Sequence, residues 1–299
     1  MTDRGKEGFL ITRRKMLPAG GALAAWSMGI IGTTTQPSHA VRQQATVTQI
    51  RNATLRIDYG GVRFLVDPML ADQGAYPGFP GSANSERRNP LVPLPMSIAD
   101  ITDVDAVIVT HLHADHWDDA AKARLKKSLP LFAQNDGDAA TIRDAGFTDV
   151  RVLTEASEFN GVKLAKTGGQ HGTDAALKAA PRLGEVCGIV FSHPSEKTLY
   201  VAGDTIWNRH VERAIAKHQP DAIVLNTGKA VIIGLDPIIM GEQDVLAVHR
   251  AAPGATLIAS HMEAVNHCIL SRAELRAFAE KEGSVSSLRV PADGETITI

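Results

Sequence analysis

The stretch that decides the fold reads Thr110-His111-Leu112-His113-Ala114-Asp115-His116-Trp117-Asp118. It directly follows an apolar run, residues 106–110, which is typical of a buried strand. In an extended chain the side chains at i and i+2 lie on the same side, so His111 and His113 can bind one metal ion together. Asp115 and His116 lie in the turn that follows and can face a neighbouring ion. Four metal-binding side chains within six residues predict a metal centre at a strand end.

Two ions need further ligands, which have to come from the ends of other strands. Three candidates lie at or just beyond such ends: His171, Asp204 and His261. His171 is flanked by glycines, which allow the backbone to approach a metal closely. Asp204 and His261 each end an apolar, strand-like run.

The remainder of the chain alternates predicted strands and helices. Strands are expected at 54–59, 62–66, 106–110, 150–153, 162–166, 186–191, 198–202, 222–225, 256–259, 285–290 and 295–299. Helices are expected at 118–129, with Asp118 as N-cap, and at 139–145, 208–218, 242–251 and 272–282. This α/β alternation predicts one domain over residues 41–299, with helices covering a pair of sheets and catalytic groups at strand ends.

One long segment, residues 71–95, has no periodic pattern and contains three glycines and five prolines. A loop of this length inside a compact domain is typical of a lid or of a disordered segment. The rings of Tyr76 and Phe79 in this segment, and of Trp207 elsewhere, favour an apolar group on the substrate.

The first forty residues resemble an export signal rather than part of the fold. Arg13 and Arg14 precede a weakly apolar run at 17–32, and Ser38 and Ala40 supply the small residues of a cleavage site. The paired arginines indicate the twin-arginine route, and hence a periplasmic location in a Gram-negative host. The alternative is a membrane anchor, but this run of sixteen residues with four glycines is short for a span of about 20 residues.

Composition excludes several classes of protein. Of the 299 residues, 44% are hydrophobic and 21% charged, which argues against a disordered chain. The formal net charge is -2, and loss of residues 1–40 removes five basic and two acidic groups, leaving -5. No basic excess indicates a nucleic-acid partner. Cys187 and Cys268 are too few for a disulfide framework; they form either one disulfide after export or two separate buried thiols.

The metal-binding residues match, in type and order, the pattern of the metallo-β-lactamase superfamily: His111, His113, Asp115, His116, His171, Asp204 and His261. Within it, the chain resembles the branch of ascorbate-phosphate lactonase-like metal-dependent hydrolases. That likeness rests on Val66-Asp67-Pro68-Met69, on residues 93–118 and on the strand end at Asp204. The resemblance implies an αββα sandwich with the metals at the rim between the two sheets.

The resemblance also implies a ligand set for two divalent ions: His111, His113 and His171 for the first, Asp115, His116 and His261 for the second, and Asp204 as the bridge. Zinc is the first choice of ion, with manganese or iron as alternatives. A hydroxide between the ions would then attack an electrophilic carbonyl carbon or phosphorus.

The sequence gives weaker evidence for a catalytic or substrate-binding role of the other polar residues. Asp67, before a proline at a strand end, is a candidate to orient a ligand imidazole, or else a simple turn carboxylate. His267 is a candidate proton donor to a leaving group, with Glu263 and Asn266 as weaker ones; the alternative is a polar loop. The stretch Asn226-Thr227-Gly228-Lys229 follows another strand, where a lysine can attract an anionic substrate or remain solvated.

The sequence therefore predicts an exported dinuclear hydrolase of a small lactone, phosphodiester or related ester. A β-lactamase-type amide hydrolase is the first alternative, but the superfamily's β-lactamases lack a bridging carboxylate such as Asp204. The acidic mature chain argues against a nuclease. A metal-binding protein without catalysis is the remaining alternative. The expected partner is a small molecule, with no nucleic acid and no stable membrane insertion after signal removal.

Overall fold

The computed structural model describes residues 44–283 and 286–299, so the predicted signal at 1–40 lies outside the described residues. Two sheets of seven strands organise these residues. The first sheet runs, in spatial order, β14 (Thr296–Thr298), β1 (Thr46–Arg51), β2 (Thr54–Tyr59), β3 (Val62–Val66), β4 (Ala106–Val109), β5 (Leu131–Ala133) and β6 (Val150–Val152). Its strands from β14 to β3 pair antiparallel, and those from β3 to β6 pair parallel.

The second sheet has the same division into parallel and antiparallel halves. It runs β13 (Leu288–Arg289), β12 (Thr256–Ser260), β11 (Ala222–Asn226), β10 (Leu199–Val201), β9 (Cys187–Ser192), β8 (Val162–Gly168) and β7 (Ser157–Phe159). Strands β10 to β13 pair parallel, and β9 pairs antiparallel with both β8 and β10. Strands β8, β10, β11 and β12 therefore all point the same way, so their carboxyl ends meet at one edge.

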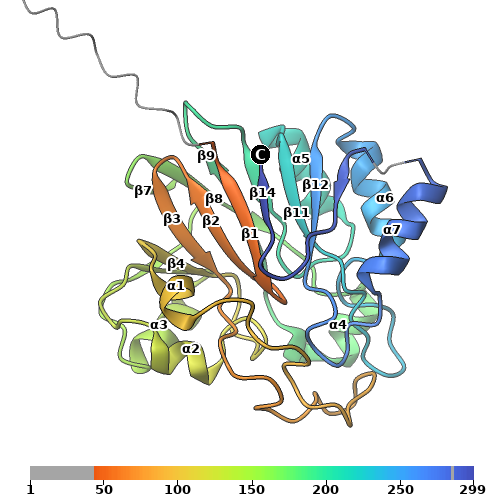
Figure 1. Cartoon of the computed structure of the whole chain (residues 1–299), viewed down its shortest axis with the longest axis horizontal. Coiled ribbons are helices and arrows are strands. Elements are labelled where there is room, and N and C mark those ends of the chain that lie inside the picture. The colour runs from red at the N-terminus through yellow and green to blue at the C-terminus, as the bar shows by residue number, and fades with distance from the viewer. Residues whose placement is uncertain (1–43, 284–285) are drawn as a thin grey trace, which may run out of the picture. The chain divides into compact units, whose positions relative to one another are not determined.

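Helices cover the outer face of each sheet (Figure 1). The first sheet carries α1 (Ile98–Thr102), α2 (Asp119–Arg124) and α3 (Asp136–Asp144). The second carries α5 (Arg209–His218), α6 (Glu242–Ala251) and α7 (Arg272–Lys281). A short helix, α4 (Asp174–Ala179), and the 3-10 turn η1 (Pro181–Leu183) pack together with residues of the loop after β11. This is the αββα sandwich that the sequence predicted.

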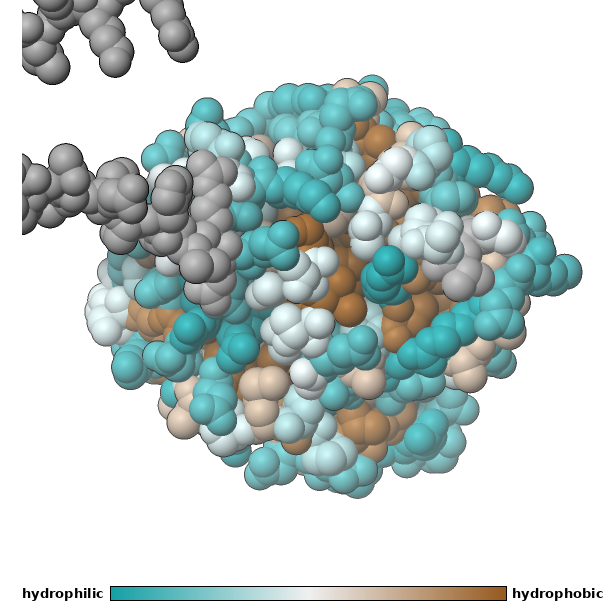
Figure 2. Space-filling model, turned by 45° about the horizontal axis from the view of Figure 1, so that its top comes forward, coloured by the Kyte–Doolittle hydropathy of each residue, from teal (hydrophilic) through white to brown (hydrophobic). Residues whose placement is uncertain are grey.

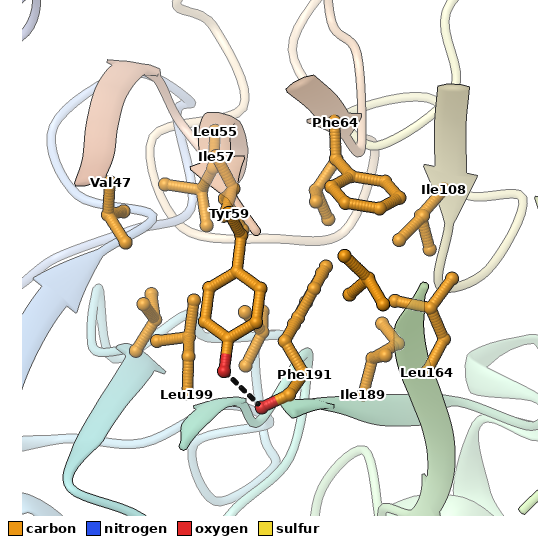
Figure 3. Close-up of a cluster of buried hydrophobic side chains, with 14 of the residues drawn as sticks. Val47, Leu55, Ile57, Tyr59, Phe64, Ile108, Leu164, Ile189, Phe191 and Leu199 are labelled. Atoms are coloured by element: carbon orange, nitrogen blue, oxygen red, sulfur yellow. Dashed lines mark hydrogen bonds between the residues drawn. The ribbon is translucent and has the colours of Figure 1, made fainter. Parts of the chain in front are cut away.

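The sandwich forms because its central strands, such as β4, β9 and β11, bury apolar side chains on both faces. In β4, Ala106 and Ile108 point between the sheets, whereas Val107 and Val109 pack under the helices of the first layer. A strand that is covered on both faces has a continuous apolar sequence. The apolar run at this segment therefore indicated a buried strand. The rings of Phe64 and Phe191 meet edge to face across the inter-sheet core, 5.3 Å apart (Figure 3).

Most predicted elements are present, and the strands at 54–59 and 62–66 and the helix at 242–251 have the predicted bounds. The helix after Asp118 ends at Arg124, short of the predicted 129, because Leu125 turns to an extended conformation that leads into β5. Strand β1 was not predicted because it buries Gln49 and Arg51, which break the apolar alternation. The other elements missed have three to six residues, too few for a period to show: α1, α4, η1, β5 and β7.

The described surface offers little apolar area. Figure 2 shows a face dominated by hydrophilic side chains, with hydrophobic residues mostly in recesses between them. Among the described residues, the large hydrophobic side chains that are exposed are Ile233 and Ile269. Within the same residues, no helix is both long and apolar enough to cross a membrane.

Tyr59 joins the two sheets by a polar contact inside the apolar core. Its hydroxyl, on β2, donates to the carbonyl oxygen of Phe191 on β9 at 3.1 Å (Figure 3). The same hydroxyl lies 2.7 Å from the carbonyl oxygen of Lys197, in the turn between β9 and β10. We expect Tyr59→Phe to lower the free energy of unfolding by about 1–3 kcal/mol, because buried carbonyls lose a donor. Urea unfolding with fixed metal content measures this. Tyr76→Phe is the control: its half-buried hydroxyl lies 3.4 Å from the Ala120 amide, and equal losses would contradict the assignment.

Candidate metal centre

The loop after β4 folds back on itself and thereby directs its polar side chains to one point. The amides of His116 and Trp117 both donate to the His113 carbonyl at 2.9 Å, which closes a tight turn. Asp118 then caps α2, accepting from the Ala121 amide at 2.6 Å, as predicted, and also from the Ala71 amide at 2.8 Å. The loop is thus fixed on both sides of its histidines.

The structure brings all seven predicted ligands together at the edge where the carboxyl ends of the strands meet. They form three overlapping groups whose ligand atoms lie within 4.8 Å of one another: His111, His113 and His171; His111, His116 and Asp204; Asp115, His116 and His261. The first and third groups share no residue, and the middle group connects them. Two neighbouring cation positions are therefore outlined by these side chains.

Asp204 lies at the centre of this arrangement, just after β10. Its Oδ2 atom is 3.1 Å from Nε2 of His116, 3.4 Å from Nε2 of His171 and 3.8 Å from Nε2 of His111. Its Oδ1 atom is 3.7 Å from Nε2 of His261. One carboxylate thus faces histidines of both cation positions, which is the geometry of a bridging ligand.

Contacts on the outer side of each ring determine which nitrogen faces the centre. Four rings place Nδ1 against an outer partner: His116 on Asp67 Oδ2 (2.8 Å), His171 on the Ile238 carbonyl (2.8 Å), His111 on Thr110 Oγ1 (3.1 Å) and His261 on Cys268 Sγ (3.3 Å). His113 is the reverse, since its Nε2 donates to the Arg182 carbonyl at 3.0 Å. Nε2 of four rings, and Nδ1 of His113, therefore remain for a metal.

The donor set fits a pair of divalent cations. Nε2 of His111 is buried and has no hydrogen-bond partner among the described residues, although a buried polar atom ordinarily has one. Burial and the neighbouring imidazoles hold the pKa of His111 well below its usual value. Burial also lowers the pKa of His171. Both rings are therefore neutral near pH 7, the form that binds metal.

Carboxylates dominate the other side of the centre. Burial disfavours the charge on Asp204, but its contacts with His116 and His261 prevail and hold its pKa well below the usual range. Burial likewise opposes ionisation of Asp115, and His116 and His261 again outweigh it and lower its pKa. In return, Asp204, Asp67 and Asp115 overcome the burial of His116 and raise its pKa to about 10. A proton and a metal cation therefore compete for the same imidazole nitrogen.

Asp67 has an uncommon backbone conformation. Its φ of +47° lies in the left-handed region, where asparagine and aspartate are the most frequent residues after glycine. One carboxylate oxygen accepts from the Thr110 amide (2.7 Å), and the other accepts from the Thr110 hydroxyl (2.7 Å) and lies 2.8 Å from Nδ1 of His116. The carboxylate thus joins the ends of β3 and β4 and touches a candidate ligand, where the sequence left a turn residue as the alternative.

Sequence reasoning missed or underrated several contacts at the centre. Nδ2 of Asn226, at the end of β11, donates to Asp204 Oδ1 at 2.7 Å. Cys268 contacts His261, and both cysteines are free, so the disulfide alternative is wrong. Strand-end placement indicated Asn226, but a thiol or carbonyl partner leaves no spacing signal.

Two charged residues considered for the site point elsewhere. Lys229 Nζ is paired with Glu242 at 2.8 Å, and Glu263 is paired with Arg272 at 2.8 Å. Neither charge is among the cavity-lining residues. Of the two alternatives for Lys229, attraction of an anionic substrate has no support in the geometry, because its charge is paired with Glu242.

Comparison with known proteins identifies the family. A family model described as a β-lactamase superfamily domain matches residues 62–262. That range includes all seven candidate ligands. The chain belongs to the metallo-β-lactamase superfamily.

Several relatives in this superfamily match most of the chain. The UPF0173 protein YddR of Bacillus subtilis is 50% identical over 253 residues, covering 84% of this chain and 99% of that protein. The structure of an isothiocyanate hydrolase from Delia radicum gut bacteria is 46% identical, with a TM-score of 0.83, covering 85% of this chain and 99% of the other. That of a possible metal-dependent hydrolase from Veillonella parvula is 44% identical, with a TM-score of 0.84, covering 86% and 100%. The chain is accordingly a metal-dependent hydrolase of the metallo-β-lactamase superfamily, as predicted.

A largely apolar cavity of about 330 Å³ opens onto the centre. The candidate ligands His113, Asp115, His171 and Asp204 line one side of it. The other walls are mostly apolar: Phe79, Pro80, Leu183, Ile232 and Ile238, with Ser82, Ala114, Arg182 and His267 among them. Of the rings expected to contact substrate, Phe79 lines this cavity, whereas Tyr76 contacts α2 and Trp207 packs on the core beside α5.

His267 is the one predicted proton-transfer residue that reaches the cavity. Burial lowers its pKa to about 4, so its imidazole is neutral near pH 7. Its Nδ1 atom has no hydrogen-bond partner among the described residues. The ring lies edge to face with Phe79, with centroids 5.0 Å apart.

The contact between Asp67 and His116 generates a prediction about metal affinity. Asp67→Asn keeps the size and tolerates a positive φ, but it removes the negative charge beside Nδ1 of His116. We expect metal affinity to fall by about 10–100-fold. Competition with a chromophoric chelator measures this. Asp72→Asn is the matched control, because that exposed carboxylate only pairs with Arg124 at 3.6 Å; a similar loss there would contradict the role of Asp67.

Proposed function

We propose that this chain is a dinuclear hydrolase of a small, neutral electrophile that carries an apolar group. The observation that carries the proposal is the position of Asp204, between two ligand groups and at the wall of an apolar cavity. His111, His113 and His171 would hold one ion, with Asp204 shared. Asp115, His116 and His261 would hold the other.

Zinc is the first choice of ion, with manganese or iron as alternatives, because imidazole and carboxylate ligands suit all three. Bound ions supply Lewis acidity, which lowers the pKa of water and stabilises negative charge on the substrate. The protein's part is to hold the ligands in register. Asn226 fixes one oxygen of Asp204, and Asp67 fixes the ring of His116.

His267 is proposed to contact the reacting group of the substrate. Its neutral ring lines the cavity beside the candidate ligand His261, with ring centroids 6.5 Å apart, and its Nδ1 has no hydrogen-bond partner among the described residues. A neutral ring there could take a proton from the attacking water and pass it to a leaving nitrogen or oxygen, which would assist bond cleavage. The largely apolar walls favour an apolar group on the substrate, with Arg182 as the cationic residue among them.

The substrate class that agrees best with these walls is an organic isothiocyanate, R–N=C=S. The relative described as an isothiocyanate hydrolase is 46% identical over nearly its whole length. In such a reaction water adds to the central carbon and the bond between carbon and nitrogen breaks. The products are the amine R–NH₂ and carbonyl sulfide, so atoms balance with one water. Lactones and phosphodiesters are the second class. Besides the ions of a loaded centre, Arg182 is the cationic residue of the cavity lining that could face the anion of a phosphodiester.

The function is tested by turnover on the metal-loaded protein. We expect about two ions per chain by elemental analysis, and amine release from benzyl isothiocyanate that a chelator abolishes and added ion restores. Asp204→Ala should lower kcat/KM at least about 100-fold while changing the unfolding temperature far less. Asp119→Ala, an exposed carboxylate on α2, is the control. Metal content near zero, or turnover confined to phosphodiesters, would refute the proposal.

We also propose that the chain is exported by the twin-arginine route, which moves folded proteins and so permits metal loading beforehand. Arg13→Lys with Arg14→Lys keeps the charge, so an ordinary signal should still function. We expect the double variant to remain as a soluble, metal-loaded precursor in the cytoplasm of a Gram-negative host. Cell fractionation with mass spectrometry of the N-terminus measures this. Continued cleavage near Ala40 would show that the paired arginines are not the signal.

A further inference from the structure

Asn266 is a fully buried amide on the segment between His261 and His267, and every polar atom of it has a partner. Its side-chain oxygen accepts from the Phe79 amide (3.0 Å) and Asn89 Nδ2 (2.7 Å), and its Nδ2 donates to the Ala83 carbonyl (2.7 Å) and Ser82 Oγ (2.9 Å). Its backbone amide donates to Asn89 Oδ1 (2.8 Å), and its carbonyl accepts from Asn84 Nδ2 (3.1 Å). All six contacts go to one segment, residues 79–89, about 180 positions earlier in the chain.

This network joins two walls of the substrate cavity. Phe79, whose amide is bound to Asn266, lines the cavity on one side. His267, the next residue in the chain, lines it beside Phe79, with the two rings 5.0 Å apart and nearly perpendicular. The position of one amide therefore fixes both rings relative to each other.

The long loop is also held at its base. Arg51, fully buried in β1, donates to the carbonyls of Met69 (2.7 Å) and Ala71 (2.8 Å) at the start of the loop. It also donates to the carbonyl of Val92 (3.0 Å) near its end. These hydrogen bonds at both ends of the loop and across its middle favour a fixed wall over the lid that its length predicts.

We propose that Asn266 is a positioning residue that sets the spacing of Phe79 and His267, and thereby the size of the apolar group that the cavity accepts. This inference rests on the proposed function only in the choice of isothiocyanates as the substrates that test it. An amide is required, because the site needs two acceptor contacts on one side and two donor contacts on the other. Asp at this position would place an oxygen against the Ala83 carbonyl.

The test compares Asn266→Ala and Asn266→Asp with Asn135→Ala in the metal-loaded protein. Asn135 caps α3 and has side-chain hydrogen bonds of its own, so its loss controls for general destabilisation. Hydrogen exchange of the Phe79 amide should become at least about tenfold faster in both Asn266 variants and stay unchanged in the control. Metal content should remain at the wild-type value in all three.

Kinetics separate positioning from mere folding. For benzyl isothiocyanate, KM should rise at least about fivefold in Asn266→Ala, while kcat for methyl isothiocyanate stays within about threefold of wild type. Equal losses of kcat/KM for both substrates would overturn the proposal. An unchanged hydrogen-exchange rate of the Phe79 amide would overturn it as well. Asn266→Asp should lose at least as much as Asn266→Ala, because its second oxygen would lie against the Ala83 carbonyl and its charge would be buried without a counter-ion.

Failure of the proposed function would be seen separately. If wild-type protein does not hydrolyse either isothiocyanate, the substrate class is wrong. Binding of benzyl alcohol, measured by saturation-transfer NMR, then replaces KM as the probe of the cavity. Weaker binding in both Asn266 variants and not in Asn135→Ala supports the positioning role, and equal binding in all overturns it.

Discussion

The burial of charged and polar ligands at one edge of the sandwich is the constraint on which the rest of the structure depends. Asp67, Asp115 and Asp204 are carboxylates removed from water within reach of the same imidazoles. Isolated, each would be costly to ionise, so cations or shared protons have to balance them. His116, which contacts all three, carries the consequence in its raised pKa. The fold must therefore be rigid enough to hold a cluster that is unfavourable until it is filled.

That rigidity comes from close approach of backbone segments around the centre. A β-carbon added to Gly228 would lie 2.1 Å from the His261 carbonyl and 2.6 Å from Cys268 Sγ. One added to Gly203, which has a φ of +70°, would lie 2.4 Å from the Cys187 carbonyl. No side chain fits at either position, so the strand ends bearing Asp204 and His261 pack directly on their neighbours.

How far sequence predicts this protein depends on how local each signal is. The ligands on the loop after β4 lie within six residues and follow an apolar strand, so spacing alone indicated them. Asp204 and His261 were predictable because parallel strands bring their carboxyl ends to one edge, a rule that needs no knowledge of contacts. Strand β1 was not predictable, because two of its residues are polar and buried. Arg51 donates to the carbonyl of Val92 in the long loop, and Gln49 donates to that of Asn52. A pattern that reads burial from hydrophobicity fails wherever a polar side chain is buried with its partners.

Asn266 shows the same limit at the cavity. In the sequence it is one polar residue in a polar loop, and its partners are about 180 positions away. The chemistry of the centre depends on residues that the order of the strands brings together. The shape of the cavity depends on contacts that only the folded loops create. Phe79 and Ile238 enter the cavity from separate loops, and neither has a local pattern that predicts its partner. Relatives with the same ligands can therefore differ in substrate through changes in these loops alone, because the ligand-bearing strand ends do not have to move.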